Sequence, residues 1–255
     1  MRDLLFINGL SCGDRTQDIF VDILRKELGG SFVIHRPNLE TMDRSSSKKA
    51  IAGIKHQFQK LKDPLVIGYS LGGLWTTLLA REGFCSQVIL ISPTLPTNML
   101  QIDLTRLKLF LPTLITGQAF SFNLDSALKY VCAHVPLKIV QDIAPYFRPE
   151  PASLIRELAM HHPFLRLSAD DCDHLLHAVQ GLIISGSRDS LCPPSKQSKL
   201  ARLLGFEQLV VDCGHMPQLG PHADAVLAAI VHFVQTGTYA NQLEDQPLHF
   251  AQGSR

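Results

Sequence analysis

The stretch Pro64-Leu65-Val66-Ile67-Gly68-Tyr69-Ser70-Leu71-Gly72-Gly73 decides the fold of this chain of 255 residues. Its apolar run 65–67 predicts a buried strand, and the residues that follow the stretch predict a helix. The pentapeptide between them has the pattern Gly-x-Ser-x-Gly. Gly68 and Gly72 lack the Cβ atoms that a sharp strand-to-helix turn would bring into collision. The turn leaves the Ser70 side chain above the sheet, at a helix N-terminus that favours negative charge, so we predict that Ser70 is a nucleophile.

Strand-like and helix-like segments alternate on both sides of this stretch. Further strands are predicted at residues 4–8, 31–35, 87–91, 181–185 and 207–212. Further helices are predicted at residues 18–28, 45–62, 195–204 and 223–235, and the helix after Ser70 is expected to end near Gly83. Strands and helices that alternate at this spacing predict an α/β fold with a doubly wound, mostly parallel sheet.

The alternation is interrupted between about residues 96 and 179. This region contains helical segments punctuated by prolines and no clear strand, and it is too long for a loop in a compact domain. We therefore predict a helical insertion at residues 97–178 between two parts of an α/β core, residues 1–96 and 179–240. Residues 241–255 are polar and are expected to form a flexible tail.

The composition excludes several classes of function. A formal net charge of +1 gives no electrostatic case for a nucleic-acid partner. The sequence contains no run of about 18 apolar residues, so no transmembrane segment is expected. The N-terminus also lacks the pattern of a signal peptide. Glycine-rich phosphate loops are absent, so no nucleotide cofactor is expected. Nothing in the pattern indicates an oligomeric state.

The six cysteines are scattered, without a Cys-x-x-Cys pair. This usage favours a reduced, cytoplasmic chain over a chain with disulfides, which is the alternative. The cysteines are Cys12, Cys85, Cys132, Cys172, Cys192 and Cys213.

Two further polar residues follow predicted strands. Asp189 follows the strand at 181–185, and His215 follows the strand at 207–212. In an open parallel sheet, ligands bind beyond the carboxyl ends of the strands, which is where Ser70 is also expected. The stretch Ser92-Pro93-Thr94, another place for an acid, contains no carboxylate.

These three side chains have complementary chemistry. A serine hydroxyl attacks a carbonyl efficiently only when a base takes its proton, and imidazole, with an ordinary pKa of about 6.5, suits that task. A carboxylate on the other ring nitrogen fixes the tautomer and stabilises the imidazolium. We therefore expect Ser70 as nucleophile, His215 as base and Asp189 as its partner. A surface turn at His215 and an Asx turn at Asp189 are the structural alternatives.

The order Ser, Asp, His, together with the elbow pentapeptide, resembles the α/β-hydrolase superfamily with a helical cap, from Leu4 to about Gln235. The resemblance implies a serine hydrolase without a cofactor or metal. It also implies an oxyanion hole made by the backbone N–H groups of Leu71 and Leu10. Leu10 takes this role because Asn8-Gly9 stands where the family usually has a His-Gly pair.

The resemblance implies hydrolysis of a carboxylic ester of a small to medium apolar substrate through an acyl-enzyme. A thioesterase, an acyltransferase and a carbon–carbon bond hydrolase use the same triad and are the alternatives. A ligand-binding protein of the same fold without turnover is the alternative from another class, because fold does not fix function. The partner expected in each enzymatic case is a small molecule, an ester or a thioester.

The inserted region is rich in large apolar side chains, and it must bury one side against the edge of the sheet at which Ser70 is expected. A mostly apolar cleft is therefore expected there. Phe110, Phe120 and Phe122 of the insertion, with Tyr69 beside the nucleophile, are the predicted substrate-binding residues.

Two other segments carry weaker signals. Residues 170–177, with His161 and His162 upstream, contain residue types that bind metals, and His174 and His177 could share a helix face. A solvated helix start capped by aspartates is the favoured interpretation. The run 106–111 could contact a lipid surface, but a cap helix that buries its apolar side over the site is favoured.

Overall fold

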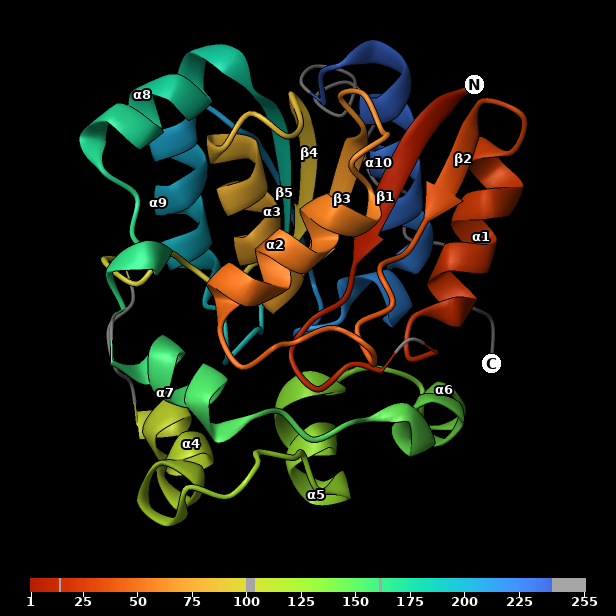
Figure 1. The fold of residues 1–255 in the computed structure, drawn as a ribbon. Helices are drawn as coiled ribbons and strands as arrows, with labels where there is room; N and C mark the ends of the chain where they lie inside the picture. The colour runs from red at the N-terminus through yellow and green to blue at the C-terminus, as the bar shows by residue number, and fades with distance from the viewer. Residues whose placement is uncertain (14, 100–103, 161, 240–255) are drawn as a thin grey trace, which may run out of the picture.

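The computed structural model describes residues 1–13, 15–99, 104–160 and 162–239 (Figure 1). A sheet of six strands lies at its centre in the order β2-β1-β3-β4-β5-β6, and every neighbouring pair is parallel. The strand order runs outward in two directions from β1 and β3, which is the doubly wound arrangement. The predicted α/β fold is thus confirmed. The strands are β1 (Arg2–Ile7), β2 (Phe32–His35), β3 (Leu65–Tyr69), β4 (Gln87–Ile91), β5 (Gln180–Gly186) and β6 (Glu207–Val211).

Helices cover both faces of the sheet and the edge at which its strands end (Figure 1). The α-helices are α1 (Asp18–Leu28), α2 (Ser47–Gln57), α3 (Leu71–Arg81), α4 (Leu104–Thr116), α5 (Leu124–Ser126), α6 (Leu137–Ile143), α7 (Ala152–Ala159), α8 (Ala169–Ala178), α9 (Pro194–Leu204) and α10 (Ala223–Thr236). Shorter turns of 3-10 or π helix are η1 (Ala127–Val131), η2 (Ala144–Tyr146), η3 (Pro163–Leu165) and η4 (Pro217–Leu219).

The core is divided into two parts by the alternation of side chains along the strands. On β3, Leu65 and Ile67 pack with residues of α1 and α10, whereas Val66 packs with residues of α2, α3, α8 and α9. Because both faces of the sheet are covered, its central strands are continuous apolar runs. This explains why the sequence showed apolar runs at these strands and no alternation with polar residues.

The helix α2 begins two residues later than the predicted start at residue 45. Ser46 is its N-cap, and the Ser46 side chain accepts a hydrogen bond from the Lys49 N–H at 3.3 Å. The next free donor, the Ser47 N–H, donates at 2.7 Å to the buried carboxylate of Glu157, which belongs to α7. The start of α2 is therefore fixed by one local contact and one distant contact.

The segment between β4 and β5 is helical, but its helices lie in two different layers. α4, α5, α6 and α7 lie across the edge at which the strands end (Figure 1), and we call residues 104–160 the cap layer. α8 instead packs beside α3 and α9 over the sheet, with Cys172 and Leu175 in the core. Part of the region predicted as an insertion at 97–178 thus belongs to the layers of the sheet. The tail expected at 241–255 lies outside the described residues.

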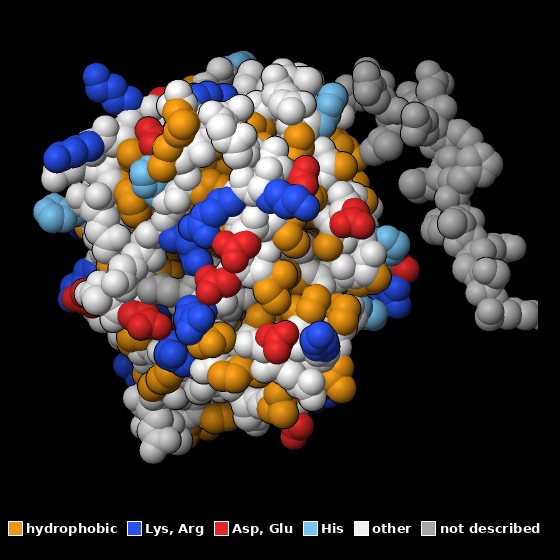
Figure 2. Space-filling view, turned by 90° about the vertical axis from the view of Figure 1, so that its right-hand side faces the viewer, with side chains coloured by type: hydrophobic (Ala, Val, Ile, Leu, Met, Phe, Trp, Pro, Cys, Tyr) orange, Lys and Arg blue, Asp and Glu red, His pale blue; other side chains and the backbone are white. Residues whose placement is uncertain are grey.

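Charged side chains are mixed in sign on the face shown in Figure 2, where basic and acidic side chains adjoin. This side carries α1 and β2, on the right in Figure 1, with an ion pair of 2.7 Å between Arg25 and Asp22. Such a surface agrees with the small net charge. Over the described part of the chain, no helix combines the length and the hydropathy that crossing a membrane requires.

The two-part core predicts that truncating a buried strand residue lowers the free energy of unfolding much more than truncating an exposed one. Leu182 on β5 is fully buried, whereas Val210 on β6 is 48% exposed. Leu182→Ala should lower the free energy of unfolding by about 2–5 kcal/mol, because it removes methyl groups and leaves a cavity. Val210→Ala should change it by less than about 1 kcal/mol. Urea unfolding followed by circular dichroism measures both, and equal losses would contradict the assigned burial of β5.

Candidate active site

Ser70 occupies a tight turn between β3 and α3, where its φ of 53° lies in the left-handed region. A residue with a Cβ adopts this conformation only when its surroundings enforce it. A Cβ on Gly72 would lie 2.2 Å from the Ile7 carbonyl oxygen, and one on Gly68 would lie 2.4 Å from the Gly72 carbonyl oxygen. The Ser70 N–H is fixed by a hydrogen bond of 2.9 Å to the carbonyl of Ile91. The backbone on three strands therefore determines where the hydroxyl points.

Ser70, His215 and Asp189 form one hydrogen-bonded row, and all three side chains are buried. His215 Nε2 lies 2.9 Å from Ser70 Oγ, and His215 Nδ1 lies 2.8 Å from Asp189 Oδ2. A carboxylate only accepts, so the Nδ1–H donates to Asp189 and Nε2 is left to accept from the serine hydroxyl. This arrangement is what proton removal from Ser70 requires.

The Asp189 carboxylate is oriented by the turn in which it lies. Its other oxygen, Oδ1, accepts from the N–H groups of Leu191 and Cys192 at 2.9 and 2.8 Å. Both oxygens are thus engaged, and the carboxylate cannot rotate away from the imidazole without losing these two bonds. The Asx turn that the sequence offered as an alternative is present, and it positions the acid.

The loops that carry Asp189 and His215 are in direct backbone contact. A Cβ on Gly186 would lie 2.0 Å from the Gly214 carbonyl oxygen, and the Arg188 N–H donates to the Cys213 carbonyl at 2.9 Å. The Arg188 guanidinium also pairs with Asp212, and its hydrogen bond holds the pKa of that carboxyl below its usual range. These contacts keep the acid and the imidazole at a fixed separation.

The two expected oxyanion donors flank the serine. Leu71 is the first residue of α3, where backbone N–H groups have no partner within the helix. Leu10 follows Gly9, whose Cβ would lie 2.9 Å from Ser70 Cβ. Neither the Leu10 nor the Leu71 N–H donates a backbone hydrogen bond within the described parts of the chain. Both are thus available beside the hydroxyl.

Ser70 and His215 open onto an apolar cavity of about 140 Å³ beneath the cap layer. Of the predicted substrate-binding residues, Tyr69, Phe110 and Phe122 line it together with Leu10 and Leu71. Phe120 does not line the cavity. Its ring packs against the two phenylalanines that do, with its centroid 5.1 Å from that of Phe110 and 4.9 Å from that of Phe122. The cavity therefore has an aromatic side, and Phe120 supports it from outside.

Sequence reasoning missed most of the aliphatic lining. Leu107 and Leu109 belong to the run 106–111, which was expected to lie over the site. The missed residues come from α4, α7, η1 and the loops after β4 and β5, and they are Thr94, Leu114, Val131, Leu158, Ala159, Leu191 and Cys192. The positions 107, 110 and 114 share one face of α4, so the helical spacing was a usable signal. It could not say which face of the helix turns toward Ser70.

All six cysteines are buried, and no disulfide joins any two of them. Burial raises the pKa of Cys12 and of Cys132, each to about 12, so these two thiols stay neutral. Asp189, Cys192 and His215 are the one set in the described chain whose metal-binding atoms lie within 4.8 Å of one another. Asp189 and His215 already hydrogen-bond each other, so this set is a part of the hydrogen-bonded row with the Cys192 thiol beside it.

The aspartate-rich segment at 170–177 lies in α8, so the helix favoured by the sequence is present, but its N-cap residue is Ser168 and not an aspartate. Ser168 and Asp171 form a capping box, in which each side chain bonds the backbone N–H of the other. Asp173 and His177 form an exposed pair at 3.5 Å. His161 lies outside the described residues.

The parallel sheet, the serine turn and the buried row define a class of α/β proteins that carry a serine, hydrogen-bonded to a histidine, above the strand ends. The family model described as Alpha/beta hydrolase family matches residues 4–229, and the chain belongs to this family. A search among curated protein sequences finds no match.

Solved structures agree on the fold. A methylesterase from Arabidopsis superposes with a TM-score of 0.68 at 16% identity, covering 92% of this chain and 99% of that one. A monoacylglycerol lipase from Paleococcus ferrophilus gives a TM-score of 0.65 at 17% identity, covering 92% and 95%. A thioesterase domain from the curacin biosynthetic pathway gives 0.61 at 16% identity, covering 92% and 91%. At these identities the likeness establishes the fold alone.

The close approach of Gly9 to Ser70 predicts that one methyl group added at position 9 lowers kcat/KM strongly. In Gly9→Ala the new Cβ would meet Ser70 Cβ at 2.9 Å and the Tyr69 ring at 3.1 Å, so the loop must move. Displacements of about 1 Å near reacting atoms lower rates by about 100-fold, and we expect a loss of that size in kcat/KM. Gly53→Ala is the control, because its Cβ would meet only the flexible end of Met42. Steady-state hydrolysis of a p-nitrophenyl ester measures both, and an unchanged Gly9→Ala rate would contradict the packing.

Proposed function

We propose that the chain is a serine esterase that cleaves carboxylic esters of small to medium apolar substrates through an acyl-enzyme. The observation that carries this proposal is the hydrogen-bonded row of Ser70, His215 and Asp189, which ends at the wall of an apolar cavity. A hydroxyl with a base in place, beside an apolar cavity, is suited to acyl transfer.

In the acylation step, Ser70 Oγ attacks the ester carbonyl while His215 Nε2 takes the hydroxyl proton. The resulting imidazolium is stabilised by Asp189, whose orientation is fixed by its two backbone donors. The carbonyl oxygen becomes an oxyanion between the N–H groups of Leu10 and Leu71. Each such donor contributes about 3 kcal/mol to lowering the barrier. His215 then gives its proton to the leaving alkoxide, and the acyl group stays on Ser70.

In the second step, water replaces the alcohol. His215 takes a proton from that water, which attacks the acyl carbonyl, and the same two N–H groups hold the oxyanion again. The collapse of this intermediate returns the proton to Ser70 and releases the carboxylic acid. No cofactor takes part in the proposed cycle.

The same row can expel a thiolate in place of an alkoxide, so thioesters of the same acyl groups belong in the substrate panel. A cytoplasmic location is part of the proposal, and six cysteines without a disulfide among them support it. A ligand-binding protein without turnover would retain the cavity and fail the labelling experiment described next.

The proposed nucleophile is tested by covalent labelling. A fluorophosphonate probe should label the wild type on the peptide that carries Ser70, and Ser70→Ala should lose both label and hydrolysis. His215→Ala should lose several orders of magnitude in kcat, and Asp189→Asn about 10⁴-fold, since an amide favours the wrong tautomer. Undiminished turnover by Ser70→Ala would refute the mechanism.

The cavity predicts an optimal acyl length. Its volume of about 140 Å³ is close to the roughly 150 Å³ of a cavity that binds benzene, so it should hold an acyl chain of about six carbons. Each buried methylene contributes about 0.8 kcal/mol, a gain of about fourfold in kcat/KM per carbon until the cavity is full. Butyrate and hexanoate esters should therefore be preferred to acetates.

A matched pair of variants on α4 tests whether the cavity sets this preference. Leu114 lines the cavity, whereas its neighbour Ile115 is 74% exposed. Leu114→Trp should fill the cavity and move the optimum toward acetate, and Ile115→Trp should leave the optimum unchanged. A p-nitrophenyl ester series from acetate to decanoate measures both. The same optimum in both variants would show that the acyl group binds elsewhere.

A further inference from the structure

The loop after β1, residues 8–13, is bonded to the cap layer through its second half, residues 11–13. The Gly13 N–H donates to the Tyr146 carbonyl at 3.0 Å, and the Arg148 N–H donates to the Ser11 carbonyl at 2.8 Å. Between these bonds Cys12 pairs with Phe147 in an antiparallel bridge. The loop that carries the Leu10 N–H thus forms a short ladder with residues 146–150, which come from a distant part of the chain.

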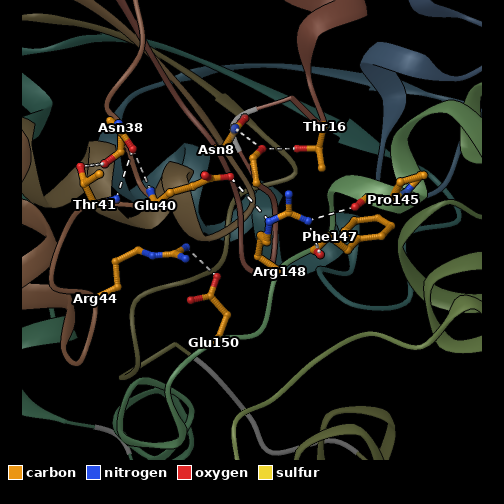
Figure 3. A network of polar contacts seen from close by, with 11 residues as sticks. Asn8, Thr16, Asn38, Glu40, Thr41, Arg44, Pro145, Phe147, Arg148 and Glu150 are labelled. Atoms are coloured by element: carbon orange, nitrogen blue, oxygen red, sulfur yellow. Dashed lines mark hydrogen bonds and ion pairs between the residues drawn. The ribbon is translucent and has the colours of Figure 1, made fainter.

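Glu150 ends this ladder with a buried carboxylate. Its Oε1 atom accepts from the Ser11 N–H at 2.7 Å and from Arg44 Nη1 at 2.8 Å, and the residue is 1% exposed. Burial raises the pKa of Glu150, while Arg44 and the Ser11 N–H act against that shift. A carboxylate is retained in such a place only when it is paired and hydrogen-bonded. Figure 3 shows Arg44 and Glu150 facing each other from different elements.

Ser11 needs such support because its φ of 58° lies in the left-handed region. Its N–H is held by Glu150 and its carbonyl by Arg148, so both of its peptide planes are fixed from the cap layer. The plane between Leu10 and Ser11 adjoins the plane that carries the Leu10 N–H. A loop released at Ser11 can therefore rotate the Leu10 N–H away from the serine.

The other side of the loop is closed by its own side chains. Asn8 Nδ2 donates to the Gly13 carbonyl at 3.1 Å, and Thr16 Oγ1 donates to the same oxygen at 2.9 Å (Figure 3). These bonds close the loop on itself, but they do not reach Ser11 or the cap layer. Glu150 is the side chain that joins the middle of the loop to the cap.

Glu150 is also connected to the wall of the cavity. Its backbone exchanges two hydrogen bonds with Phe120, of 2.8 and 2.7 Å. The Phe120 ring packs edge-on against Phe110 and Phe122, and those two rings line the cavity. One residue therefore contacts both the loop beside Ser70 and the aromatic support of the acyl site.

We propose that Glu150 is a positioning residue: through Ser11 it holds the Leu10 N–H in line with the oxyanion, and through Phe120 it ties that placement to the cavity wall. This inference rests on the proposed esterase function. The chain order gives no hint of it, because Glu150 and Ser11 are 139 residues apart.

The test compares Glu150→Met, which removes the acceptor at similar size, with Glu150→Gln, which keeps an oxygen for the Ser11 N–H. Loss of an oxyanion donor lowers kcat by about 100- to 1000-fold, and for a displaced donor we expect a loss of about 10- to 100-fold in Glu150→Met. KM should stay within about twofold, because ground-state binding is not affected. Glu150→Gln should stay within about fivefold of the wild-type kcat.

Two further measurements separate positioning from simple destabilisation. Rates are divided by the concentration of active sites titrated with the fluorophosphonate, so that unfolded protein does not count. A trifluoromethyl ketone, which forms a tetrahedral oxyanion on serine, should bind Glu150→Met more weakly by the same factor as kcat falls.

Glu157 provides a matched control. It is another buried carboxylate of the cap layer that accepts a backbone N–H from the core, that of Ser47, and it makes none of the described contacts with residues 8–13. Glu157→Met should lower the thermal midpoint and leave kcat per titrated site unchanged. Equal kcat losses in the two Met variants, or a Glu150→Met kcat within about threefold of wild type, would overturn the proposal.

If Glu150→Met does not fold, Arg44→Met takes its place. This change leaves the Ser11 acceptor but removes the cation that fixes it, and it should lower kcat per site by at least about threefold with KM unchanged. An unchanged kcat would overturn the proposal. Failure of the esterase function itself would appear differently, as a wild type that neither hydrolyses the esters nor takes the label, or as hydrolysis that persists in Ser70→Ala.

Discussion

The close contact of backbone with backbone at the Ser70 turn is the constraint on which the rest of the structure depends. Gly72 lies against the Ile7 carbonyl so tightly that a Cβ would come within 2.2 Å of it. This contact fixes the start of α3 against β1, and the parallel register of the sheet then brings the ends of β5 and β6 to the same edge. Ser70, Asp189 and His215 meet because their strands end together. The hydrogen bonds between them follow from that arrangement and do not create it.

The features that could be predicted from the sequence are those encoded over a few neighbouring residues. The bounds predicted for α1 and β4 agree with the structure, because Gly29-Gly30 ends the helix and an apolar run defines the strand. Ser70, Asp189 and His215 could be selected as a group because each follows a strand in a recognisable turn, and the structure brings them into one hydrogen-bonded row. The expected start of α2 was wrong by two residues, since a contact with Glu157 from a distant helix helps to set it. Local signals do not contain such information.

The cap layer was the least predictable part for the same reason. Its apolar residues are evident in the sequence, but which of them face Ser70 depends on how α4 lies over the sheet. Leu114 lines the cavity and Ile115 beside it is exposed, although the two residues are almost identical in size and hydropathy. The layer of α8 is a second example, because its packing beside α9 becomes evident only from the tertiary contacts.

The attachment of the cap layer to the core explains how an apolar covering can still be held in one position. Apolar contacts are not directional, and a cap held by them alone could shift over the sheet. Glu150 and Glu157 each accept a backbone N–H from the core at 2.7 Å, and both carboxylates are buried. Buried polar contacts of this kind must be made in one geometry, because a shift would leave a charge without its partners. The cap is thus fixed at the start of α2 by one carboxylate and at the loop beside Ser70 by the other. The aromatic wall of the cavity and the loop that carries the Leu10 N–H therefore belong to one connected structure.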